Sequence, residues 1–254
     1  MVFVRLLYSN QARYGVLEGQ EIQLIEGTPW QKYSPARERI GIERAKLLAP
    51  CQPSKVVCVG LNYADHVQEF GDRPLPKEPV LFLKPSSSVI GPGAPIVYPA
   101  ISRQVDHEAE LAVVIKEETR LVSVKEAGRR ILGYTCGNDV TARDLQRKDG
   151  QWTRGKSFDT FCPLGPCIVD HLEPEGAVIQ LLVNNEMRQN SHTSHMIFPV
   201  EYLVSFISQV MTLFPGDVIM TGTPAGVGQI IPGDTVTVRI PGVGELTNTV
   251  INGV

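Results

Sequence analysis

Alternation of apolar and polar positions marks the beginning of the chain. The segments VFVRLLY, RYGVLEG and QEIQLI each follow the period-two pattern of half-buried strands, and Glu-Gly-Gln at residues 18–20 is typical of a hairpin turn. A polar stretch at residues 34–46 suggests a helix, and Pro50 and Pro53 then interrupt the chain. We therefore expect a small β-rich N-terminal domain at residues 1–53.

The remainder, residues 54–254, is expected to form one larger catalytic domain. Short apolar and β-branched runs predict strands near residues 55–59, 80–83, 108–115, 131–138, 178–183, 217–221, 234–240 and 246–251. Helices are fewer: Ser123 and Glu126 have the spacing of a capping box, and Pro199 precedes apolar residues at helical spacing. The pattern predicts an α+β fold that is mostly β.

Composition and charge narrow the functional classes. Of 254 residues, 43% are hydrophobic and 20% are charged, so the chain can bury a large core and is unlike a disordered protein. The net charge is −3 and no cluster of Lys or Arg stands out, which argues against nucleic acid and anionic membranes as partners. No apolar run is long enough to span a bilayer, and the N-terminus lacks the apolar stretch of a secretory signal.

Cysteine usage indicates the compartment. The chain has five cysteines, an odd number, and none of them form a C-x-x-C pair. A disulfide framework is not expected, and a reducing cytoplasm fits this pattern.

The segment VDHEAELAVVI at residues 105–115 carries the most informative chemistry. Side chains alternate between the two faces of a strand, so Asp106, Glu108 and Glu110 are expected on one face. Neighbouring carboxylates on one face repel each other unless a cation lies between them. Asp139 follows another apolar run and is expected at the end of a strand, where ligands usually project.

Carboxylate ligands favour a hard cation. Mg²⁺ or Mn²⁺ fits such a set, with water or substrate completing the coordination, and Ca²⁺ is an alternative. The spacing alone is equally compatible with glutamates that are simply solvated, and it does not connect Asp139 to them.

Two further groups could transfer protons or bind an anion. His66 and Glu69 are three residues apart and would face the same way on a helix, where the carboxylate raises the basicity of the imidazole. An ordinary surface pair is the alternative interpretation. Lys156 lies among Gly, Ser and aromatic residues, which is compatible with a pocket wall, although a lone Lys is usually solvated.

Substrate carboxylates could be bound just after Asp139. Arg143 and Gln146 follow it, and guanidinium groups match carboxylates well. The segment TGTPAGVG at residues 221–228 could cradle an anion with its backbone N–H groups, or it could be a structural turn. It has no G-K-[ST] and no G-x-G-x-x-G order, so a nucleotide-dependent transferase is a weak alternative.

Several motifs together resemble the fumarylacetoacetate hydrolase family. They are GLNYADHV-x-E, LFLKP, D-x-E-x-ELAVVI, GNDVTARD, KSFD and TGTPAGVG, and the match runs from about residue 55 to the C-terminus. The resemblance implies a β-sandwich roll, a homodimer and bound Mg²⁺ or Mn²⁺. The N-terminal part is similar to that of bacterial 2-hydroxyhepta-2,4-diene-1,7-dioate isomerases and acylpyruvate hydrolases.

The resemblance also implies roles for individual residues. The metal ligands fall on Glu108, Glu110 and Asp139. The catalytic groups fall on His66, Glu69 and Lys156. The substrate-lining positions fall on Arg143, Gln146 and Thr223.

The sequence departs from the family pattern at two histidines. His107 stands where an aromatic residue is common, and we expect it to point away from the ligands. His195 replaces a frequent Asp and could alter a dimer or rim contact.

The expected activity is a metal-dependent reaction of small 2-oxo or 2-hydroxy-diene dicarboxylic acids through an enolate, by isomerisation or decarboxylation in aromatic catabolism. Cleavage of acylpyruvates by hydrolysis and decarboxylation of oxaloacetate are alternatives, because the same residues support all of these reactions. A non-catalytic module that binds a metal and an oxo-acid is a more distant alternative.

Overall fold

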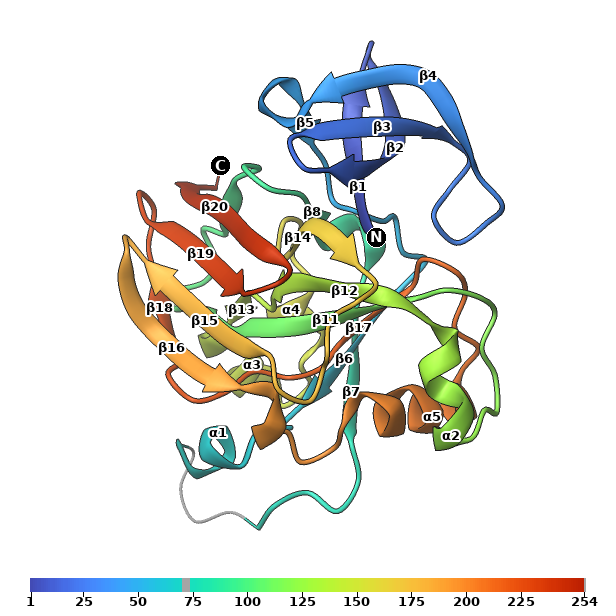
Figure 1. Cartoon of the computed structure of the whole chain (residues 1–254). Coiled ribbons are helices and arrows are strands. Elements are labelled where there is room, and N and C mark those ends of the chain that lie inside the picture. The colour runs from blue at the N-terminus through green and yellow to red at the C-terminus, as the bar shows by residue number, and fades with distance from the viewer. Residues whose placement is uncertain (70–73, 254) are drawn as a thin grey trace.

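The chain is organised around three β-sheets (Figure 1). The computed structural model describes residues 1–69 and 74–253. The largest sheet has the strand order β4-β3-β2-β1-β14-β12-β11-β17-β6-β7, with β5 paired to β1 and β8 paired to β14. The second sheet has the order β16-β15-β19-β20-β9, and the third has the order β13-β10-β18.

The N-terminal strands extend the largest sheet and form the upper part of the molecule in Figure 1. They are β1 (Val2–Tyr8), β2 (Gln11–Glu18), β3 (Glu21–Glu26), β4 (Ser34–Gly41) and β5 (Lys46–Leu47). β1 pairs antiparallel with β14 (Cys162–Val169), which places Val2 opposite Val169. The domain boundary at residue 53 stays a prediction.

The predicted helix at residues 34–46 is wrong. β4 pairs with β3, and only a short 3₁₀ turn, η1 (Ile42–Arg44), follows it. β4 ends the strand order of its sheet, so most of its side chains face solvent. Its polar composition therefore reflects its position at the edge of the sheet and does not indicate a surface helix.

The largest sheet is buried at its centre. The remaining strands of this sheet are β6 (Val56–Gly60), β7 (Val80–Lys84), β8 (Val89–Ile90), β11 (Ala109–Ile115), β12 (Ile131–Asn138) and β17 (Val218–Met220). Every residue of β11 is buried, because both faces of this strand are covered. That explains its continuous apolar run.

The two smaller sheets complete the β framework. One contains β9 (Ile96–Tyr98), β15 (Val178–Val183), β16 (Glu186–His192), β19 (Thr235–Ile240) and β20 (Gly244–Asn252). The other contains β10 (Val105–His107), β13 (Thr141–Ala142) and β18 (Gly228–Ile230).

Helices are short and lie at the edges of the sheets. They are α1 (Ala64–Glu69), α2 (Val124–Ala127), α3 (Arg143–Asp149), α4 (Thr153–Lys156) and α5 (Val200–Val210), with 3₁₀ turns η2 (Ser86–Ser88), η3 (Gly128–Arg130) and η4 (Thr193–His195). The predicted capping box of Ser123 and Glu126 opens α2, which lies beside α5. None of the helices within residues 1–69 and 74–253 has the length and apolar character needed to cross a membrane.

The main core lies where the largest sheet meets the five-stranded sheet. It joins Leu111 and Val113 of β11 with Ile179 and Leu181 of β15 and Val238 of β19. The predicted mostly β, α+β fold is confirmed.

Candidate active site

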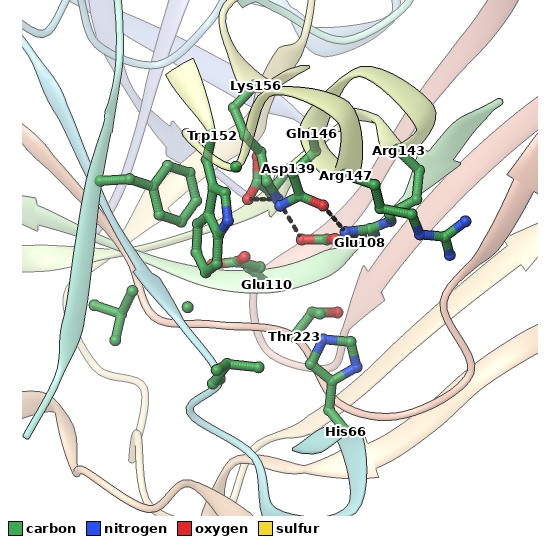
Figure 2. A pocket seen from close by; sticks show the side chains of 15 residues that line it. His66, Glu108, Glu110, Asp139, Arg143, Gln146, Arg147, Trp152, Lys156 and Thr223 are labelled. Carbon is green, nitrogen blue, oxygen red and sulfur yellow. Dashed lines mark hydrogen bonds and ion pairs between the residues drawn. The ribbon is translucent and has the colours of Figure 1, made fainter. Parts of the chain in front are cut away.

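A cavity of about 530 Å³ opens beside the ends of β6, β7, β11 and β12, with α3 and α4 on one side and α1 on the other (Figure 2). Its lining residues are Val59, Gly60, Leu61, His66, Phe82, Glu108, Glu110, Asp139, Arg143, Gln146, Arg147, Gly150, Trp152, Lys156 and Thr223.

Three buried carboxylates form one wall of this cavity. Glu108 lies where the chain passes from β10 to β11, Glu110 lies in β11, and Asp139 directly follows β12. Antiparallel pairing of β11 with β12 brings the segments together, and the Asp139 amide donates to the Glu108 carbonyl at 2.9 Å. One carboxylate oxygen from each residue lies within 4.8 Å of the others, which defines the acidic triad.

Two buried lysines bind the acidic triad. Lys156 Nζ donates to Glu108 Oε2 at 2.8 Å and to Asp139 Oδ2 at 2.6 Å. Lys84 Nζ donates to Asp139 Oδ1 at 2.6 Å and to the Val140 carbonyl at 3.1 Å. Both ammonium groups therefore face carboxylates rather than water, as buried charges require.

The surroundings separate the proton affinities of these groups. Burial raises the pKa of Glu110 well above its usual range, and the negative charges of Asp139 and Glu108 raise it further. Burial also acts on Glu108, but Lys156 and Arg143 outweigh it and hold the pKa of Glu108 well below its usual value. Burial opposes the charge of Lys156, whereas Asp139 and Glu108 raise its pKa above the ordinary value.

The acidic triad suits a divalent cation. Glu108 and Asp139 are bound by the positive charges of Lys156, Lys84 and Arg143, whereas Glu110 lies among like charges that a bound cation would offset. The donor set is entirely oxygen, which hard cations such as Mg²⁺ and Mn²⁺ prefer. Glu108, Glu110 and Asp139 could hold such an ion.

Arg143 is engaged by protein groups. Its Nε donates to Asp106 at 2.8 Å, one terminal nitrogen donates to Glu108, and the other donates to Gln146 Oε1 at 2.7 Å. Asp106 and Glu108 thus lie on one side of their segment, as predicted. Because the Arg143 guanidinium donates to three protein acceptors, it holds Glu108 in place. The predicted contact between Arg143 and the substrate stays a prediction.

The His66–Glu69 pair forms on α1 as the spacing predicts. His66 is buried and lines the cavity, and its Nδ1 lies 2.8 Å from Glu69 Oε2. The other oxygen of Glu69 accepts a hydrogen bond from the Gly226 amide at 2.7 Å. Glu69 does not itself line the cavity, so it acts on the pocket through His66.

The glycine-rich segment binds the protein's own carboxylates. The Gly222 amide donates to Glu110 Oε2 at 2.7 Å, as the Gly226 amide does to Glu69. Gly222 has φ +101°, and a Cβ there would lie 2.8 Å from the Asn62 side chain. A side chain is excluded at Gly222 for both reasons. The backbone donors that were candidates for anion binding therefore hold Glu110 and the His66–Glu69 pair in place.

A buried amide orients Thr223. Gln189 Nε2 donates to Thr223 Oγ1 and to the Pro224 carbonyl, both at 2.8 Å, while its Oε1 accepts from the Ala109 amide at 2.9 Å. Because Thr223 Oγ1 accepts this bond, its hydroxyl proton can be donated into the cavity. His107 Nδ1 lies 3.2 Å from the same Gln189 oxygen, and His107 does not line the cavity, as expected.

An apolar wall faces the acidic triad. Phe82 and Trp152 meet edge to face, with ring centroids 5.2 Å apart. A Cβ on Gly60 would lie 2.4 Å from the Trp152 ring, so only glycine lets the indole pack there. The site thus combines a charged wall with an aromatic one.

The structure brings the predicted residues together. Eight of the nine line the cavity, and Glu69 contacts it through His66. Their chemical roles stay predictions. His195 is exposed, lies outside this cavity and has its Nδ1 3.2 Å from Ser191 Oγ, so its effect on a rim contact also stays a prediction.

The sequence interpretation missed Lys84, Arg147 and Trp152. Lys84 could have been found, because three buried carboxylates need more than one cation and LFLKP places a lysine at the end of an apolar strand. Trp152 is one of the aromatic residues near Lys156 that were compatible with a pocket wall, whereas nothing in the sequence pattern distinguishes Arg147 from an ordinary surface residue.

Comparison with known proteins identifies the family. Residues 55–251 match the family described as fumarylacetoacetate (FAA) hydrolase C-terminal, and residues 1–50 match the one described as Rv2993c-like, N-terminal. The chain therefore belongs to the fumarylacetoacetate hydrolase family, as its motifs suggested.

Similar proteins include isomerases, hydrolases and tautomerases. A 5-carboxymethyl-2-hydroxymuconate delta-isomerase structure from Mycobacterium smegmatis is 44% identical, covers 100% of both chains and has a TM-score of 0.94. The oxaloacetate tautomerase Fahd2a of Rattus norvegicus is 44% identical over 80% of this chain and 69% of that protein. A fumarylpyruvate hydrolase structure from Pseudomonas aeruginosa, in complex with Mn²⁺ and pyruvate, is 35% identical, covers 78% of this chain and 90% of that one, and has a TM-score of 0.74.

Proposed function

We propose that the protein is a divalent-cation-dependent enzyme that isomerises small 2-oxo or 2-hydroxy-diene dicarboxylic acids through an enolate. The single observation that carries this proposal is the placement of the acidic triad, Lys156 and the His66–Glu69 pair around one cavity. The isomerase and tautomerase named among the similar proteins support the same reaction class.

Glu108, Glu110 and Asp139 would hold the cation, with Mg²⁺ or Mn²⁺ as the expected ions. A bound divalent cation supplies Lewis-acid stabilisation to the negative charge that develops on the 2-oxo oxygen. Lys156 adds a positive charge at the same wall, because its ammonium lies between Glu108 and Asp139.

His66 is the proton-transfer group of this proposal. The Glu69 carboxylate next to Nδ1 favours the tautomer with a proton on that nitrogen, which makes Nε2 the basic one. From the 2-hydroxy (enol) form, His66 takes the hydroxyl proton, and the resulting enolate is protonated on the carbon beside the 2-oxo group or on a conjugated carbon. Protonation of the adjacent carbon gives tautomerisation to the ketone, and protonation of the conjugated carbon gives isomerisation.

Hydrolysis of acylpyruvates is the second candidate, and the same His66–Glu69 pair favours it. An imidazole held by a carboxylate can deprotonate a water molecule, which would attack the distal acyl carbonyl and release pyruvate. The Pseudomonas aeruginosa fumarylpyruvate hydrolase is consistent with this branch. Decarboxylation of oxaloacetate needs no attacking water and is a third outcome of the same enolate chemistry.

The test measures isomerisation and pyruvate release with one panel of substrates. Enol-to-keto conversion of oxaloacetate and isomerisation of a 2-hydroxy-diene dicarboxylate are measured by the loss of dienol or enol absorbance with added Mg²⁺ or Mn²⁺. Pyruvate formation from acylpyruvates and from oxaloacetate is measured in parallel. We expect isomerisation, with a loss of about 10²–10⁴-fold in His66→Ala and no loss in His195→Ala, which removes an exposed histidine outside the cavity.

Two results would contradict the proposal. The first is pyruvate release from acylpyruvates without any isomerisation, which would select the hydrolase. The second is isomerisation at an unchanged rate in His66→Ala, which would remove His66 from the reaction.

A further inference from the structure

The cationic side chains of the cavity differ in what they bind. Arg143 and Lys156 are both bound to carboxylates of the protein. Arg147 also lines the cavity, and its hydrogen bond within the described chain goes to a neutral acceptor, Gln104 Oε1, at 3.3 Å. Among the residues that the structure describes, no carboxylate forms an ion pair with it.

Arg147 lies one helical turn beyond Arg143 on α3. Residues four apart share a face of a helix, and the rise between them is about 6 Å. Arg143 is buried against Glu108, whereas Arg147 is exposed. The guanidinium of Arg147 thus occupies the outer part of the cavity, separated from the acidic triad (Figure 2).

The cavity also has an apolar part, where Trp152 and Phe82 pack edge to face. A ligand that reaches from the acidic triad to Arg147 needs a polar head at the triad and an anionic tail at the guanidinium, joined by a short carbon chain.

We propose that Arg147 binds the distal carboxylate of a dicarboxylate substrate and makes the site selective for 2-oxo diacids over 2-oxo monoacids of equal length. This inference rests on the proposed function, because that function places the 2-oxo head at the acidic triad. The guanidinium fork matches a carboxylate with two parallel hydrogen bonds. Gln104 cannot compete as a donor to the ligand, since its amide nitrogen already donates to Asp106.

The experiment measures binding rather than turnover. Saturated 2-oxo diacids of five, six and seven carbons, and 2-oxo monoacids of the same lengths, are titrated calorimetrically into the Mg²⁺-loaded protein. The variants are Arg147→Ala, Arg147→Lys and the control Lys148→Ala. Lys148 is the next residue of α3, is exposed and does not line the cavity, so its removal changes net charge alone.

We expect the wild type to bind at least one diacid more tightly than its matched monoacid. Arg147→Ala should weaken that diacid by about 10–100-fold and leave the monoacid within about twofold, because only the diacid loses a charge-assisted hydrogen bond. Arg147→Lys should retain part of the preference, and Lys148→Ala should retain all of it.

The inference is overturned if the wild type shows no diacid preference, if Arg147→Ala weakens both ligand types equally, or if Lys148→Ala causes the same loss. Failure of the proposed function is a separate result. If diacid binding depends on Arg147 but no isomerisation is seen, the proposed activity is wrong and the carboxylate subsite stands. If isomerisation occurs but does not depend on Arg147, the proposed activity stands and the subsite is wrong.

Discussion

Substitution of Lys84 by Met removes a buried cation while keeping the length of the side chain. Lys84 is fully buried, and its ammonium contacts Asp139 and the Val140 carbonyl. Removal of one partner of a buried ion pair costs about 3–5 kcal/mol. Asp139 keeps its contact with Lys156 at 2.6 Å, so we expect the lower end, about 3 kcal/mol.

The loss is measured by urea unfolding without divalent cations. With a slope of about 2 kcal/mol per M, the midpoint of Lys84→Met should fall by about 1.5 M. Lys148→Met is the control, because Lys148 is exposed and no ion pair of it is found among the described residues. Its midpoint should not move.

Added Mg²⁺ extends the same test. Without Lys84 the acidic triad faces one ammonium group instead of two, so a bound dication should stabilise the variant more than the wild type. An unchanged midpoint in Lys84→Met, or an equal Mg²⁺ response in both proteins, would refute this reasoning.

Three further predictions concern other buried groups. Gln189→Leu should cost about 1–3 kcal/mol in urea unfolding, because it leaves the Ala109 amide and the Thr223 hydroxyl without their partner; a cost below 0.5 kcal/mol would contradict this. Asp217→Asn should cost about 3 kcal/mol in the same assay, since this fully buried carboxylate binds the Lys55 ammonium; equal midpoints would speak against the pair. Burial raises the pKa of all five thiols, to about 11 in Cys167, so iodoacetamide at pH 8 should label none of them in the native protein and all of them in urea; rapid native labelling detected by mass spectrometry would contradict this burial.

Local periodicity predicted the parts of the site that depend on one strand. The alternation in residues 105–115 placed Asp106 and Glu108 on one side, and both contact Arg143. The spacing of His66 and Glu69 likewise predicted their pairing on a helix. Both features need only the geometry of a single element.

Contacts between distant segments could not be predicted from periodicity. Asp139 meets Glu108 because β11 and β12 pair in a particular register, which no local pattern specifies. The resemblance to a family, not the spacing, supplied that connection. The partner of Arg143 was also beyond local reasoning, since an arginine binds a substrate or a protein carboxylate according to the fold around it.

Edge position explains the one element that was predicted wrongly. Residues 34–41 are polar because β4 lies at the end of its sheet, and a polar stretch without clear periodicity does not distinguish an edge strand from a surface helix. Pairing with β3 determines the outcome, and that pairing is a tertiary property.

Titration of Mn²⁺ into the protein, followed by the electron paramagnetic resonance of the free ion, tests the acidic triad most directly. The wild type should bind one ion, and Glu110→Gln should lose that binding, because it removes a ligand of the triad. Glu186→Gln removes an exposed carboxylate far from the triad in sequence and should bind as the wild type does. Unchanged Mn²⁺ binding in Glu110→Gln would contradict the assignment of the metal site.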